Sequence, residues 1–255
     1  MINCCGQNVL DPLHRWNEDF KQKVYNSRVK TNEMLARAIR ESEDPPAAFI
    51  HMSGVGFYPP DRLAEAGSRG QTEASPGGQH DWLASLVKDW EAAAQLPTSS
   101  STRVVSLRSG VVLGRKGGMI QQTLLPFFFG LGGRIGPGDQ VMPWVHVKDV
   151  AGLMVHAVTS PMSGVYNTVS PSRVTNAEFT AAYARALSRP AIFPVPGFVM
   201  QTIFGAERAA MVLESQTVIP ERTLDSGYNY RFGDIKEACE EFAHLDYHDQ
   251  DEPGL

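Results

Sequence analysis

The sequence predicts an α/β fold built on a parallel sheet with helices on its faces. The first observation is a set of compact apolar runs, typical of buried parallel strands, at residues 2–6, 48–52, 104–107 and 165–169. The second is helical periodicity between these runs, at residues 17–41, 81–95 and 150–158. Strands that alternate with helices at this spacing indicate a doubly wound parallel sheet.

The individual elements carry their own signals. Residues 17–41 show helical spacing of Phe20, Val24, Thr31, Leu35 and Ile39, and Pro45-Pro46 ends this helix. Residues 81–95 place one apolar face at Trp82, Leu83, Leu86, Val87, Trp90 and Ala94. Residues 111–113 continue the strand at 104–107, and Asp149 is the expected N-cap of the next helix. Thr175 and Glu178 have the capping-box spacing that opens a further helix.

The composition excludes several classes of protein. Hydrophobic residues make up 42% of the 255 residues and the formal net charge is -5, so there is no electrostatic basis for binding nucleic acid. The longest apolar stretch, 124–133, is interrupted by Pro126 and glycines, so no membrane span is expected. Cys4, Cys5 and Cys239 form neither a disulfide framework nor a metal motif. We therefore expect no metal site and an intracellular location, with the cytoplasm favoured.

Ligands of open α/β sheets bind beyond the carboxyl ends of the strands. In this sequence, that rule selects the glycine-containing junctions at residues 4–7, 53–58 and 108–114.

Five segments in these and neighbouring positions resemble motifs of the extended short-chain dehydrogenase/reductases. They are Ile-Asn-Cys-Cys-Gly-Gln-Asn at 2–8, Asn-Ser-Arg-Val-Lys-Thr at 26–31, the serine-bearing strand end at 52–58, Arg-Ser-Gly-Val-Val-Leu-Gly at 108–114, and the segment 143–151. The sequence most resembles the atypical 39U branch of the NAD-dependent epimerase/dehydratase family, including its helical module at 196–242. The resemblance implies a Rossmann-like fold and an NADP-dependent oxidoreductase or epimerase-like protein that acts on a small molecule.

The sequence departs from the family in its first segment. The family begins with a strand and a Gly-x-x-Gly-x-x-Gly turn that approaches the cofactor pyrophosphate, and no such turn precedes Asn3. We therefore expect an N-terminally truncated domain lacking about 50 residues, the length of a strand-helix-strand unit and part of a crossover. An alternative start, a splice product or a gene-model fault would each produce it. For such a truncated domain we expect weak or absent NADP binding. We also expect that it needs a homo-oligomer or another stabilising partner.

The second departure concerns catalysis. Most of the superfamily uses a Tyr-x-x-x-Lys pair as its general acid-base system, and none of the seven tyrosines here is followed by lysine at that spacing. Two alternatives to an active oxidoreductase therefore stay open. One is a non-catalytic pseudoenzyme that binds nucleotide or protein, and the other is an inactive truncated isoform. The expected organisation is a Rossmann-like part at 1–190, a helical module at 194–243 and a disordered tail at 244–255.

The resemblance implies candidate site residues. Cofactor contacts are expected from Cys4, Cys5, Gly6, Lys23, Arg28, Arg108 and Val112. Catalytic candidates are Ser53, Tyr58 and Lys88. Each has an ordinary structural alternative, because a helical lysine is often solvated and a serine at a strand end often bonds the loop backbone. His146 and Asp149 are expected to stabilise the loop before a helix.

Overall fold

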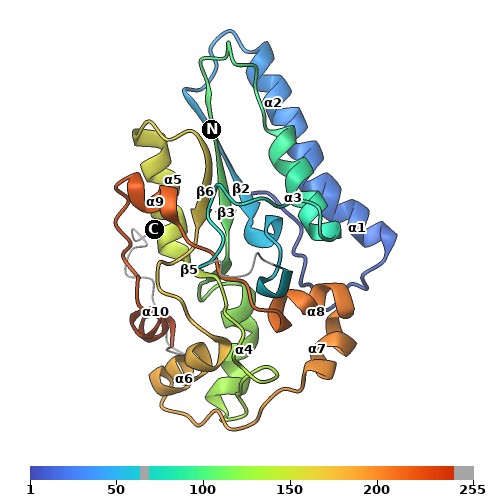
Figure 1. Ribbon diagram of the computed structural model, residues 1–255, viewed down its shortest axis with the longest axis vertical. Helices are drawn as coiled ribbons and strands as arrows, with labels where there is room; N and C mark the ends of the chain where they lie inside the picture. Colours follow the sequence, from blue (N-terminus) through green and yellow to red (C-terminus); the bar gives the residue numbers. More distant parts are fainter. Residues whose placement is uncertain (64–68, 244–255) are drawn as a thin grey trace, which may run out of the picture.

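The computed structural model describes residues 1–63 and 69–243, and it contains a four-stranded parallel sheet in the order β1-β2-β3-β6 (Figure 1). Its strands are β1 (Ile2–Asn3), β2 (Ala48–Gly54), β3 (Arg103–Ser109) and β6 (Gly164–Thr168). The parallel α/β fold expected from the sequence is confirmed, and Ile50 of β2 lies opposite Ile2 on one side and Val105 on the other.

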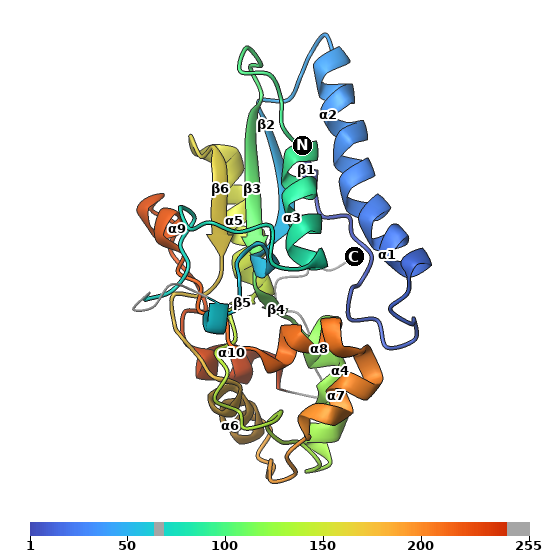
Figure 2. The same ribbon diagram turned by 45° about the vertical axis from the view of Figure 1, so that its right-hand side comes forward.

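Helices cover both faces of this sheet (Figures 1 and 2). One face carries α1 (Glu18–Tyr25), a π-helical segment (Asn26–Lys30), α2 (Thr31–Glu41) and α3 (Trp82–Ala93), and the other carries α5 (Val147–Thr159). Consecutive residues of β2 serve the two faces, because side chains alternate along a strand. Phe49 packs with Ile39 and Ala94, whereas Ile50 packs in the cluster that contains Leu153.

The first strand is shorter than the predicted 2–6. The side chain of Asn3 accepts a hydrogen bond from the backbone N–H of Cys5 at 3.0 Å and donates to Asn32 at 2.8 Å. These bonds turn the chain out of the sheet directly after Asn3, so the prediction for residues 4–6 is wrong.

Residues 111–113 do not continue β3, which corrects the second strand prediction. They form β4 (Val111–Leu113), which pairs with β5 (Trp144–His146) in a separate two-stranded sheet. Gly110 makes this change of sheet possible, because a side chain there would collide with the carbonyl oxygen of Pro143.

A second core lies beyond the carboxyl ends of the main sheet. It joins β4 and β5 to α4 (Gly118–Phe128), α6 (Asn176–Ala186) and α10 (Ile235–Phe242). The capping box of Thr175 and Glu178 that opens α6 is confirmed. Helix α4 was not predicted; its sequence is part of an apolar stretch interrupted by Pro126 and glycines. Residues 130–138 form a loop after this helix.

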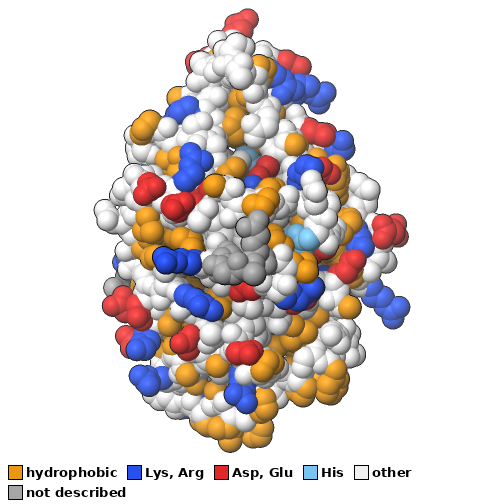
Figure 3. Space-filling model, viewed as in Figure 1, with side chains coloured by type: hydrophobic (Ala, Val, Ile, Leu, Met, Phe, Trp, Pro, Cys, Tyr) orange, Lys and Arg blue, Asp and Glu red, His pale blue; other side chains and the backbone are white. Residues whose placement is uncertain are grey.

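The remaining helices follow α6 along the chain. They are α7 (Gly197–Phe204), α8 (Ala206–Leu213) and α9 (Glu221–Asp225). Apolar side chains gather on the surface at the end of the molecule that holds α4, α6 and α7 (Figures 1 and 3). Exposed apolar residues of the described chain include Phe129, Leu131, Ile192 and Phe198. Across residues 1–63 and 69–243, no helix has the length and apolarity to span a membrane. The predicted disordered tail, 244–255, lies outside the described residues.

Candidate functional site

The predicted cofactor edge lies directly after β1. Cys4, Cys5 and Gly6 are exposed, and the Cys4 thiol donates a weak hydrogen bond to the sulfur of Met154 at 3.8 Å. The next residue is fixed from the helix side, since the N–H of Gln7 donates to Ser27 Oγ at 2.9 Å. This short segment therefore offers backbone and small side chains to a ligand at the end of the sheet.

Arg28 faces this edge from the π-helical segment. A Cβ atom on Gly6 would lie 3.0 Å from its Cζ, so the absence of a side chain at Gly6 gives the guanidinium its place. The guanidinium also lies over the ring of Trp90, with 5.0 Å from Cζ to the ring centroid. Single π-helical turns are frequent at functional sites, because the extra residue redirects side chains.

Arg28 is a partly buried cation without a carboxylate partner. Burial lowers the pKa of Arg28 to about 10, which still leaves it charged at neutral pH. Its hydrogen bonds are two long ones from Nη1, to Val24 O and Ser27 Oγ, both at 3.4 Å. Among the described residues no Asp or Glu makes an ion pair with it. A buried positive charge is costly unless it is paired, so this position is suited to an anionic ligand.

A second arginine on the neighbouring strand has the opposite environment. Arg108 is 4% exposed and donates from Nε and Nη2 to the two carboxylate oxygens of Glu91, each at 2.7 Å. Ser53 donates its hydroxyl to the same carboxylate at 2.6 Å. Burial opposes the charge of Arg108, but the carboxylate of Glu91 outweighs it and raises the pKa of the guanidinium. This charge is therefore already neutralised within the protein.

Tyr58 extends this network toward β6. Its hydroxyl accepts a hydrogen bond from Arg108 Nη1 and donates to Asn167 Oδ1, both at 2.8 Å. Burial raises the pKa of Tyr58, despite the nearby guanidinium. The guanidinium of Arg108 also stacks on the ring of Phe57, 3.5 Å from Cζ to the centroid. The structure thus brings Ser53, Tyr58 and Arg108 together in a fully bonded, buried cluster.

The other predicted site residues lie outside this cluster. Lys88 on α3 and Lys23 on α1 are exposed, and Val112 is half-buried in β4 opposite Val145. In the described part of the chain, neither lysine makes a hydrogen bond or ion pair. Lys88 is therefore the catalytic candidate whose polar group is accessible.

Glu91 was missed from the sequence, although a signal for it existed. It follows Val87 by four residues and precedes Ala94 by three, so it falls on the apolar face of α3. A carboxylate on a buried face requires a cationic partner, and Arg108 supplies it. Glu91 and Trp90 are adjacent, so one turn of α3 contacts both arginines.

The prediction that Asp149 is the N-cap of the next helix is wrong, because α5 begins at Val147 and its N-cap is His146, whose Nδ1 accepts a hydrogen bond from Lys148 N at 3.1 Å. Both residues nevertheless make contacts that stabilise the start of this helix. The His146 ring stacks on Phe232 with centroids 3.9 Å apart, and burial lowers the pKa of this histidine. The carboxylate of Asp149 accepts hydrogen bonds from Tyr228 OH, Arg231 N and Phe232 N. These contacts tie the start of α5 to the C-terminal segment.

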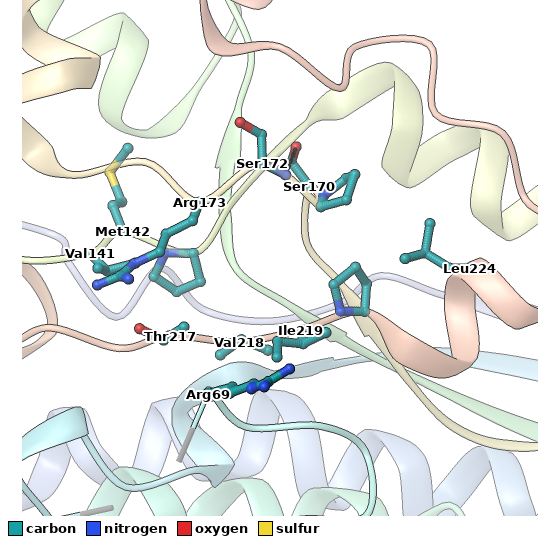
Figure 4. A pocket seen from close by; sticks show the side chains of 13 residues that line it. Arg69, Val141, Met142, Ser170, Ser172, Arg173, Thr217, Val218, Ile219 and Leu224 are labelled. Atoms are coloured by element: carbon teal, nitrogen blue, oxygen red, sulfur yellow. Dashed lines mark hydrogen bonds between the residues drawn. The ribbon is translucent and has the colours of Figure 1, made fainter. Parts of the chain in front are cut away.

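A small cavity of about 160 Å³ lies beside the buried cluster of Ser53, Tyr58 and Arg108 (Figure 4). Three prolines and several aliphatic side chains line it, with the cationic side chains of Arg69 and Arg173 beside them. None of the predicted site residues lines it. Its wall meets the buried cluster at Ile219, whose carbonyl accepts a hydrogen bond from Asn167 at 2.9 Å.

Comparison with known proteins identifies the family of the chain. The sequence profile of the NAD dependent epimerase/dehydratase family matches residues 11–169. The chain belongs to this family. A second profile, described as a domain of unknown function (DUF1731), matches residues 195–242 of this epimerase-family chain.

Relatives of this epimerase-family protein occur in animals and bacteria. The human epimerase family protein SDR39U1 is 48% identical over 243 residues, which are 95% of this chain and 81% of the relative. The epimerase family protein MT2273 of Mycobacterium tuberculosis is 34% identical, over 93% of this chain and 76% of the relative. A crystal structure of human SDR39U1 (isoform 2) with NADPH superposes with a TM-score of 0.91 at 48% identity and covers 95% of this chain and 80% of that one.

More distant structures share the fold alone. MoeE5, crystallised with UDP-glucose and NAD, superposes with a TM-score of 0.69 at 16% identity, over 94% of this chain and 77% of that one. The Rossmann-like epimerase fold with a small helical C-terminal region, expected from the sequence, is confirmed, and the family is NAD(P)-dependent.

Proposed function

We propose that this protein is an NADP(H)-dependent oxidoreductase that acts on a small molecule and binds its cofactor between Cys4–Gly6 and Arg28. The observation that carries the proposal is the guanidinium of Arg28, which is partly buried, charged and without a carboxylate partner among the described residues. The cofactor carries several phosphate charges, and arginine is well matched to phosphate oxygens. The 48% identical human relative was crystallised with NADPH, which supports this choice of cofactor.

The residues proposed to bind the cofactor differ from the residue proposed to meet the substrate. Ser53 and Tyr58 have their hydroxyls bonded to Glu91 and Asn167, so neither presents a free hydroxyl to a substrate. Lys88 keeps an exposed ammonium on α3, the helix that also contacts both arginines. We therefore assign cofactor binding to the edge around Arg28 and retain Lys88 as the candidate group that meets the substrate.

The test is a titration with NADPH followed by fluorescence, since Trp90 lies beneath Arg28. The variant is Arg28→Gln, and the matched control is Arg37→Gln, an exposed arginine of α2. Loss of one charge-assisted hydrogen bond removes about 1.5–3 kcal/mol, which raises Kd by roughly 10- to 150-fold. R37Q should bind as the unsubstituted protein does.

Two results would refute the proposal. One is an unsubstituted protein that shows no saturable binding of NADPH, which is instead the result expected if binding needs a Gly-x-x-Gly-x-x-Gly turn before Asn3. The other is a folded R28Q protein with unchanged affinity, which would place the cofactor elsewhere. Circular dichroism of R28Q tests whether the variant is folded.

A further inference from the structure

A third arginine connects the C-terminal helices to the segment that follows the cofactor edge. Arg208 of α8 is 1% exposed. Its Nη1 donates to the carbonyl oxygens of Val9 and Asp11 at 3.1 and 2.9 Å, and its Nη2 donates to that of His14 at 3.0 Å. Its Nε donates to Phe204 O at 2.7 Å. Residues 9–14 thus wrap their carbonyl groups around one guanidinium.

No Asp or Glu of the described residues lies within ion-pair distance of Arg208, although the more distant carboxylate of Asp11 favours its charge. The guanidinium is otherwise surrounded by carbonyl dipoles and by the rings of Trp16, Phe20 and Phe204, 5.4–5.9 Å from Cζ to the centroids. A planar fork of donors is required to reach three carbonyl groups on one loop, and a lysine cannot supply it.

Long-range hydrogen bonds reach this loop from the side chain of Arg208. The loop's own hydrogen bonds are short-range, such as Leu13 N to Asp11 Oδ1 at 2.9 Å and Leu10 N to Asn8 Oδ1 at 3.0 Å. The preceding residue of α8 contacts the far end of the loop, because Glu207 accepts a hydrogen bond from Trp16 and lies 3.1 Å from Lys21 Nζ. Adjacent residues of α8 therefore fix both ends of residues 9–16.

We infer that Arg208 is a positioning residue through which α8 orders residues 9–16 and thereby the cofactor edge at Cys4–Gly6. The part that concerns the cofactor rests on the proposed function. Because linkage between two sites is reciprocal, cofactor binding at the edge stabilises α8, and an ordered α8 strengthens cofactor binding. On this inference α8 influences the cofactor site through residues 9–16.

The test compares Arg208→Lys with a matched control, Arg222→Lys. Arg222 also donates to several acceptors, namely the carbonyl groups of Val165 and Ser163 and the hydroxyl of Tyr166, but it lies at β6 and α9. Hydrogen exchange of residues 8–16 and of α8 is followed by mass spectrometry with and without NADPH. Thermal unfolding of both variants measures any general loss of stability.

We expect exchange within residues 8–16 and the Kd for NADPH each to rise on the order of tenfold in R208K, as for the loss of one buried hydrogen-bonded contact. NADPH should slow exchange in α8 of the unsubstituted protein and not in R208K. R222K should show neither change at a comparable melting temperature. An R208K protein whose residues 8–16 exchange no faster than those of R222K would overturn the inference.

The two measurements, hydrogen exchange and NADPH affinity, also distinguish this inference from the proposed function. If the unsubstituted protein does not bind NADPH, the proposed function fails, and the exchange of residues 8–16 still decides whether Arg208 orders the loop. If NADPH binds equally well to R208K and to the unsubstituted protein, the cofactor site stands and the link through α8 is refuted.

Discussion

Replacing Glu91 by glutamine should destabilise the protein strongly, because it leaves the charge of Arg108 buried and unpaired. The side chains of Arg108 and Glu91 are 5% and 11% exposed, and two hydrogen bonds of 2.7 Å join them. Breaking a buried pair by removing one charge costs about 3–5 kcal/mol. For a chain of this size, 1 kcal/mol lowers Tm by about 2–4 °C, so E91Q should melt about 6–20 °C lower.

The assay is urea and thermal unfolding of E91Q, R108M and the double variant. Because the two side chains interact directly, the double variant should be less destabilised than the sum of the single variants by about 1–3 kcal/mol. Glu33→Gln is the control, since it removes an exposed partner of Lys30 at 2.8 Å and should change stability by less than about 1 kcal/mol. Additive losses in the double variant would refute the pairing, and a loss in E91Q no larger than in E33Q would refute its burial.

Three further changes test other parts of the structure. Ser53→Ala should lower the free energy of unfolding by about 1–2 kcal/mol and leave NADPH affinity unchanged, because its hydroxyl is bonded to Glu91; a tenfold change in Kd would instead show contact with a ligand. Asp149→Asn should cost about 2–4 kcal/mol in urea unfolding, since its amide group cannot accept from both backbone N–H groups and Tyr228; unchanged stability would contradict this. Burial lowers the pKa of His51, so below about pH 6.5 the histidine binds a proton in the unfolded chain but not in the folded protein, and the free energy of unfolding should fall as the pH drops. His51→Gln should reduce this dependence of the unfolding free energy on pH, and an unchanged dependence would count against the argument.

The main sheet was predictable because its signals are local. The runs at 48–52, 104–107 and 165–169 are apolar enough to mark buried strands, and the structure extends or shifts each of them by one or two residues. The helix at 81–95 was equally clear, and it is observed as Trp82–Ala93.

Two of the errors have a different cause, since they depend on contacts between distant parts of the chain. Val111–Leu113 changes sheet because Gly110 lies against Pro143, which a local reading cannot reveal. Helix α4 forms despite Pro126 because Ile120, Leu124 and Phe127 are buried in the second core. The site shows the same limit: a charge on the apolar face of α3 is visible in the sequence, but the contact of Arg208 with Val9 spans 199 positions and has no local signal.

The π-helical segment constrains which insertions and deletions the protein can accept. Ser27 and Asn32 both hold the end of the first strand, through Gln7 and Asn3 respectively. They are five positions apart, a spacing that a π-helical turn brings toward one side and a regular α-helix does not. Removing one residue between them would restore regular helical geometry yet break one of the two attachments. Length in this segment is therefore under tighter constraint than the identity of its exposed side chains.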